Sequence, residues 1–111
     1  MQDYVSFAVG SRTLTAYIKC EIDHHTARKM RERIDEKLFE FKPEILIIDF
    51  SDVKFMDSSG LGLVLGRCER AESVGARVRL TGMSSPIYRL MRLCGIEKIK
   101  NLTVSVCESA G

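Results

Sequence analysis

Residues 45–70 decide the fold, and they read ILIIDFSDVKFMDSSGLGLVLGRCER. The continuous apolar run at residues 45–48 predicts a β-strand that is buried on both faces. Apolar residues then recur at helical spacing at Leu61, Leu65 and Cys68, which predicts a helix that begins close to Ser58. An acidic, hydroxyl-rich turn therefore lies at the N-terminus of a helix, where backbone N–H groups point outward without partners. We expect function to be located at this turn.

The chain as a whole has the composition of one globular domain. It has 111 residues, of which 45% are hydrophobic and 29% are charged, and this length is sufficient for a single core. The net charge of +2 is too small and too dispersed to indicate binding to nucleic acid or to a membrane surface. No apolar run reaches membrane-spanning length, and the first residues do not resemble a signal peptide. We therefore expect residues 1–111 to form one soluble, cytoplasmic domain.

The first part of the chain predicts a β-hairpin followed by an amphipathic helix. Apolar residues alternate over residues 4–9 and again over residues 14–18, around a glycine-containing turn. Asp23 is placed to cap a helix whose apolar residues recur at three- and four-residue steps up to Phe41, and Pro43 ends that helix. The other side of this helix carries basic residues that we expect to be solvated rather than to form a docking patch, namely Arg28, Lys29, Arg31 and Arg33.

The last part of the chain predicts strand, helix and strand. Residues 76–80 alternate as a strand with one face in water, and residues 102–106 form a last strand. Between them we expect a helix with Ser85 as its N-cap and Gly95 at its end. Its inner stripe is predicted to be Ile87, Leu90, Met91 and Cys94. The element order is β-β-α-β-α-β-α-β, which predicts an α/β fold: a mixed sheet with an antiparallel hairpin, parallel neighbours and packed helices.

The cysteines are predicted to be small, reduced core residues. Cys20, Cys68, Cys94 and Cys107 have no C-x-x-C spacing, and each falls on a predicted strand or on or near the apolar side of a helix. We expect no metal site, no disulfide and no cofactor.

Three glycines, Gly60, Gly62 and Gly66, fall in the first turns of the central helix. Each should cost roughly 1 kcal/mol relative to alanine, so something must offset that cost. Gly62 and Gly66 share one face of the helix. Either the helix lies close against the sheet there, or the backbone of a partner approaches it.

Ser58 is a candidate for modification. A phosphate there would add about two negative charges, which a helix N-terminus favours and the neighbouring Asp57 opposes. These opposing effects should leave the fold intact while changing the surface potential sharply. The simpler alternative is that Asp57, Ser58 and Ser59 only cap the helix.

The run from Phe55 to Gly62, preceded by Ile48-Asp49-Phe50, closely resembles the signature of STAS-domain proteins, specifically the bacterial anti-anti-sigma factors, with the sporulation members as the nearest match. Residues 23–27 and residues 82–96 are similar to two further segments of that family, so the resemblance covers nearly the whole chain. One departure is Cys20-Glu21-Ile22, where such proteins commonly have Gly-Glu-Leu. We expect this change to affect packing rather than function.

The resemblance implies a phosphorylation switch in a protein that is not itself an enzyme. The unphosphorylated form would bind an anti-sigma factor that is also a serine kinase and release its sigma factor. Phosphorylation of Ser58 would end this binding, and a PP2C-like phosphatase would reverse it. The implied partner surface consists of Asp23, Asp57, Ser58, Ser59, Gly60, Leu61 and Gly62. A STAS regulator of a stress pathway is the alternative within the family.

Two other classes of function compete with this interpretation. A serine hydrolase would need a base, but His24 and His25 have no second acid placed to orient them, so solvated or capping histidines are favoured. A nucleotide-binding module is disfavoured because the glycine spacing misses the dinucleotide pattern and no P-loop lysine is present. Arg67 and Arg70 lie on the central helix near the implied partner surface, and the sequence does not distinguish docking residues from solvated residues there.

Overall fold

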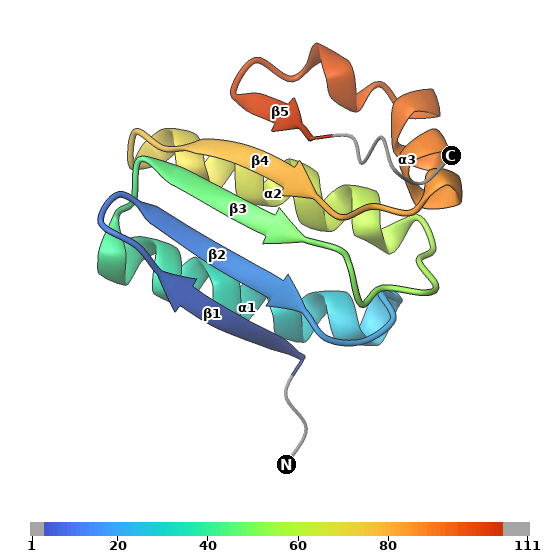
Figure 1. Ribbon diagram of the computed structural model, residues 1–111, viewed down its shortest axis with the longest axis horizontal. Coiled ribbons are helices and arrows are strands. Elements are labelled where there is room, and N and C mark those ends of the chain that lie inside the picture. The colour runs from blue at the N-terminus through green and yellow to red at the C-terminus, as the bar shows by residue number, and fades with distance from the viewer. Residues whose placement is uncertain (1–3, 106–111) are drawn as a thin grey trace.

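The computed structural model describes residues 4–105, in which five strands form one mixed sheet (Figure 1). The strands are β1 Val5–Val9, β2 Thr13–Ile18, β3 Ile45–Asp49, β4 Arg77–Thr81 and β5 Leu102–Val104. They lie side by side in chain order. β1 is antiparallel to β2, and every later pair is parallel. The predicted α/β fold and mixed sheet are thereby confirmed.

Three helices connect the strands: α1 His24–Phe41, α2 Ser59–Ser73 and α3 Ser85–Leu93. A short 3-10 helix, η1 Ile96–Lys98, follows α3 and was not predicted. Figure 1 shows α1 and α2 side by side on the same face of the sheet, while α3 lies beyond the C-terminal end of β4. The N-termini of α1 and α2 are therefore next to each other, as expected when two parallel strands feed two crossover helices.

The core lies between the sheet and the α1–α2 layer, and this corrects one prediction. In β3, Leu46 and Ile48 are fully buried, whereas Ile45 and Ile47 are only half-buried. The prediction that this strand is buried on both faces is wrong, because α1 and α2 cover the same face. A continuous apolar run does not by itself distinguish a covered face from an open one.

Asp23 caps α1 as predicted. Its Oδ1 accepts hydrogen bonds from the backbone N–H of His25 at 2.9 Å and of Thr26 at 2.8 Å, and the Thr26 hydroxyl oxygen accepts one from the Asp23 N–H at 2.9 Å. The hydrogen bond from the Thr26 backbone is the main reason why the pKa of Asp23 lies below its ordinary value. The helix ends at Lys42, which adopts a left-handed conformation with φ of 46° just before Pro43.

Helix α3 differs from its prediction in two respects. Its N-cap is Ser84 rather than Ser85. Ile87 and Met91 are buried as predicted, but Leu90 and Cys94 are exposed, so the inner stripe is only half as wide as expected. The helix is short and touches the core along one narrow line.

The three cysteines within the described residues differ in burial. Cys68 is buried, and burial raises the pKa of its thiol to about 11, which makes it an unreactive core residue. Cys20 is half-buried, and Cys94 is exposed, so the prediction of a core position is wrong for Cys94. Cys107 and the end of the last predicted strand lie outside the described residues.

Within residues 4–105, no helix combines the length and the apolarity that crossing a lipid bilayer would require. The same part of the chain contains no group of three or more histidine, cysteine or acidic residues that is arranged to hold a metal ion.

Candidate functional site

Two loops are joined directly beneath the N-termini of α1 and α2. The Ile22 N–H donates to the Phe55 carbonyl oxygen at 3.0 Å, and the Asp57 N–H donates to the Ile22 carbonyl oxygen at 3.1 Å. Ile22 and Met56 thereby form an isolated parallel bridge outside the main sheet. This bridge places Asp23 beside the turn at residues 56–60, so the two parts of the predicted partner surface lie next to each other.

Asp57, rather than Ser58, uses its side chain at the start of α2. Asp57 Oδ1 accepts a hydrogen bond from the Ser59 N–H at 2.7 Å. Ser58 occupies the N-cap position with helical backbone angles, and its hydroxyl makes no capping hydrogen bond. Ser58 is exposed, while Asp57 and Ser59 are half-buried. The side chain of Ser58 therefore does not cap the helix, and Ser58 is an exposed residue at the helix N-terminus.

The three glycines of α2 differ in how much space surrounds them for a side chain. Gly60 is buried, and a Cβ there would overlap Sδ and Cγ of Met56, so a side chain at this position would force the buried Met56 to move. At Gly62 and Gly66 a Cβ would meet no atom within 4 Å. Close packing against the sheet, one of the two explanations considered from the sequence, is therefore wrong for these two glycines. Leu61, between them and the turn, is half-buried against the core.

The two histidines are exposed at the first turn of α1. His24 lies near the central turn, since it lines a groove together with Ser59. The adjoining Asp23 carboxylate is occupied by the backbone N–H groups that it caps. This placement agrees with solvated histidines and gives Ser58 no oriented base of the kind that a serine hydrolase needs.

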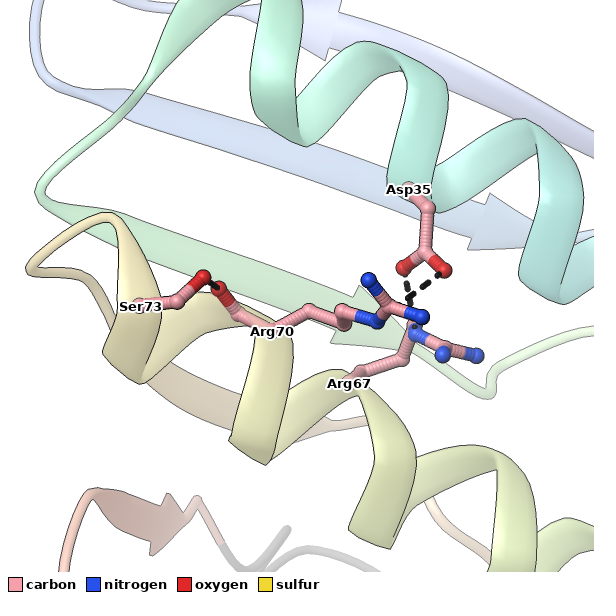
Figure 2. A network of polar contacts seen from close by, with 4 residues as sticks. All are labelled: Asp35, Arg67, Arg70 and Ser73. Atoms are coloured by element: carbon pink, nitrogen blue, oxygen red, sulfur yellow. Dashed lines mark hydrogen bonds and ion pairs between the residues drawn. The ribbon is translucent and has the colours of Figure 1, made fainter.

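Arg67 is a core residue, not a docking residue. Its side chain is 2% exposed, and its Nε lies 2.7 Å from Oδ1 of Asp35 across the α1–α2 contact (Figure 2). The N–H is not aligned as a hydrogen bond, and Nη1 is also buried without a partner among the described residues. Arg70 is 58% exposed and reaches Asp35 Oδ2 at 4.0 Å.

Burial dominates the electrostatics of this pair. Removal from water raises the pKa of Asp35 despite the attraction of Arg67 and Arg70, and it lowers the pKa of Arg67 despite the attraction of Asp35. Sequence reasoning missed the pair because its members lie on different helices. The available signal was a lone arginine between Gly66 and Cys68, on the side of α2 that carries the core residues.

A match to the STAS domain family covers residues 4–109. The chain is 34% identical over 79 residues to the anti-sigma F factor antagonist of Paenibacillus polymyxa, a match that covers 71% of this chain and 68% of the relative. It is 31% identical over 84 residues to the anti-sigma-B factor antagonist of Listeria monocytogenes, covering 75% of this chain and 72% of the relative. These names describe regulatory proteins rather than enzymes.

Among solved structures, the chain is similar to the anti-sigma factor antagonist SpoIIAA in its unphosphorylated form, with 29% identity, a TM-score of 0.76, and coverage of 96% of this chain and 91% of that chain. It is also similar to SpoIIAA of Bacillus in the phosphorylated form, with 29% identity, a TM-score of 0.69, and coverage of 96% and 95%. The chain belongs to the STAS domain family, and these relatives are anti-sigma factor antagonists.

Proposed function

We propose that this protein is an anti-sigma factor antagonist controlled by phosphorylation of Ser58. In its unphosphorylated form it binds a cytoplasmic anti-sigma factor that is also a serine kinase, and this binding releases the sigma factor. The kinase phosphorylates Ser58 and thereby ends the interaction, and a PP2C-like phosphatase restores the active form.

The observation that carries this proposal is the placement of Ser58. Its hydroxyl is exposed at the N-terminus of α2 and takes no part in capping the helix, because Asp57 supplies the capping oxygen instead. A kinase can reach this oxygen without unfolding the turn. Since no capping hydrogen bond depends on it, its modification removes no such bond from the fold.

The partner surface around Ser58 is built on fixed elements. The bridge between Ile22 and Met56 holds the start of α1 against the turn, and the buried Gly60 is seated on Met56. Asp23, Ser59, Leu61 and Gly62 are thereby arranged around Ser58. A partner that covers this surface would desolvate Ser58, and a phosphate there would place about two negative charges in a contact that excludes water.

The solved relative supports the view that the switch acts locally. The unphosphorylated and phosphorylated forms of SpoIIAA both share the fold of this chain. In this chain the helix N-terminus attracts a phosphate at Ser58, an effect worth about 0.3–1 kcal/mol, while Asp57 repels it. We therefore expect no rearrangement of the sheet.

Two pathways are candidates for the one that this protein controls. The relative in Listeria monocytogenes is named an anti-sigma-B factor antagonist, whereas the relative in Paenibacillus polymyxa is named for sigma F. Sporulation is proposed here, and a stress pathway is the alternative. Measuring affinity for each type of anti-sigma factor separates the two.

The test of Ser58 is incubation with the anti-sigma factor kinase and ATP, followed by peptide mass analysis. We expect one phosphate on the peptide that contains Ser58, none in Ser58→Ala, and a phosphate still on that peptide in Ser59→Ala. Labelling that persists in Ser58→Ala would overturn the assignment.

A further inference from the structure

A groove runs between the N-terminal halves of α1 and α2, and Gly62 keeps it open. The groove has a volume of about 430 Å³, and Gly62 is one of its lining residues. A Cβ at Gly62 would meet no atom within 4 Å, so no packing inside the described chain requires a glycine there. The cost of this helical glycine, roughly 1 kcal/mol relative to alanine, is therefore left without an internal explanation. A surface that must receive another chain supplies one.

One wall of the groove is basic. His24, Arg28 and Arg31 line it from α1, at positions separated by one helical turn each. None of the residues that line the groove within residues 4–105 is acidic. Arg28 and Arg31 form no ion pair with the described residues, in contrast to Arg67. The local field therefore favours a negatively charged occupant.

The acidic residue of the neighbouring α1–α2 contact, Asp35, does not neutralise the positive charge of the groove. Asp35 lies one helical turn beyond Arg31, and Figure 2 shows Arg67 and Arg70 both directed at its carboxylate. Two arginines share one acid there, so this end of the contact is also net positive.

The groove also has apolar lining residues, which indicate a protein segment rather than a free anion. These residues are Ala27 from α1 and Leu63 from α2. Binding of a small anion would leave this apolar surface in water, whereas a peptide segment with a small apolar side chain would cover it.

We propose that this groove is the docking site for an acidic segment of the anti-sigma factor, which places a small apolar side chain against Ala27 and Leu63 and carboxylates beside Arg28 and Arg31. The inference rests on the proposed function and adds the chemistry of the partner segment. It also gives phosphorylation a second way to weaken binding. Ser59 lines the groove, so a phosphate on the adjacent Ser58 would repel the incoming carboxylates.

The experiment measures the affinity of the full chain for the purified anti-sigma factor kinase by calorimetry, with ADP in place of ATP so that no phosphorylation occurs. Arg28→Glu reverses the charge of the wall, and Gly62→Leu fills the groove. Lys29→Glu is the matched charge control, because Lys29 is exposed on α1 and does not line the groove. Ser73→Leu is the matched size control, because Ser73 is a small, exposed residue of α2 and does not line the groove.

We expect Arg28→Glu and Gly62→Leu to weaken binding by about tenfold or more, and both controls to stay within about twofold of the parent. Thermal melts of all variants check that they fold, and Arg28→Gln replaces Arg28→Glu if the latter does not. A photo-crosslinking residue at position 62 should capture a partner peptide that contains Asp or Glu.

Three outcomes would overturn the proposal. If the parent binds and Ser58 phosphorylation abolishes binding, but the groove variants bind as tightly as their controls, the groove inference fails while the proposed function stands. Capture of a segment rich in Lys or Arg would contradict the acidic assignment alone. A parent chain that does not bind any anti-sigma factor would contradict the proposed function and this inference together.

Discussion

At the scale of single residues, the central turn depends on two oxygens with separate tasks. Asp57 supplies the capping oxygen of α2, and Ser58, one residue later, keeps its hydroxyl in solvent. A residue that must be modified cannot also be needed to hold the turn together. These separate roles, capping by Asp57 and modification at Ser58, explain why an acidic residue and a serine are adjacent here.

The glycines of α2 should respond oppositely to the same substitution. Gly60→Ala forces a Cβ into Met56, which is itself buried beneath the turn, and should lower the free energy of unfolding by about 1–3 kcal/mol. Gly62→Ala adds a Cβ in open space and should raise it by up to about 1 kcal/mol. Urea denaturation of the two variants checks both signs. Equal destabilisation by both would contradict the assignment of separate roles.

The cap of α1 should give the protein a measurable acid sensitivity. The pKa of Asp23 is lowered in the fold, so its charged cap contributes stability at neutral pH, and this contribution is lost as pH falls below about 4 and through the folded pKa. Asp23→Asn retains an acceptor oxygen but does not titrate. The difference in unfolding free energy between parent and Asp23→Asn should therefore shrink as the pH is lowered. A difference that is constant from neutral to acid pH would contradict this account.

At the scale of elements, the contact between α1 and α2 combines buried apolar residues with two ion pairs that share Asp35. Arg67→Met leaves the Asp35 carboxylate, whose side chain is 19% exposed, with only the longer contact to Arg70. We expect a loss of about 2–4 kcal/mol, because a partly buried charge is left without its partner. The double variant Asp35→Leu with Arg67→Met should recover most of it, since neither charge remains.

The control for this prediction is Arg70→Met, which should change stability by less than about 0.5 kcal/mol because Arg70 is 58% exposed. Chemical denaturation of the parent and of these three variants provides the measurement. A stable Arg67→Met single variant would show that the ion pair adds nothing to the packing of the two helices.

The helices and strands also show which features of the fold can be predicted from the sequence and which cannot. Periodicity and caps predicted the three helices and five strands, because Asp23, Pro43 and Gly95 act locally. The pattern could not show that β3 has one open face, since that depends on where α1 and α2 pack. For the same reason it misplaced Arg67 and Cys94, whose burial is decided by other elements.

At the candidate site, the sequence located the turn and the neighbouring cap, but not the groove. Asp23 and residues 57–62 are adjacent in the fold because a single backbone bridge joins their loops. The basic wall was visible as a cluster of arginines on α1, but only the packing of α2 shows that Arg28 and Arg31 face Gly62. Glycine spacing alone left two explanations open, and the empty space around Gly62 and Gly66 removes one of them.

At the scale of the whole molecule, the sheet and helices form a rigid support for one switchable surface. The chain has a net charge of only +2, so a local dianion can dominate the potential of the surface around Ser58. The turn rests on the loop bridge and the core, whereas Ser58 itself faces solvent. We therefore expect phosphorylation to change binding without changing the architecture.

The most direct test is a calorimetric titration of the anti-sigma factor kinase, in the presence of ADP, with the unphosphorylated chain and with the chain phosphorylated at Ser58. We predict that phosphorylation weakens the affinity by about two orders of magnitude, a coupling of a few kcal/mol. Backbone amide shifts of the free phosphorylated chain should change only around the turn and the N-termini of α1 and α2. Equal affinities of the two forms would contradict the central claim.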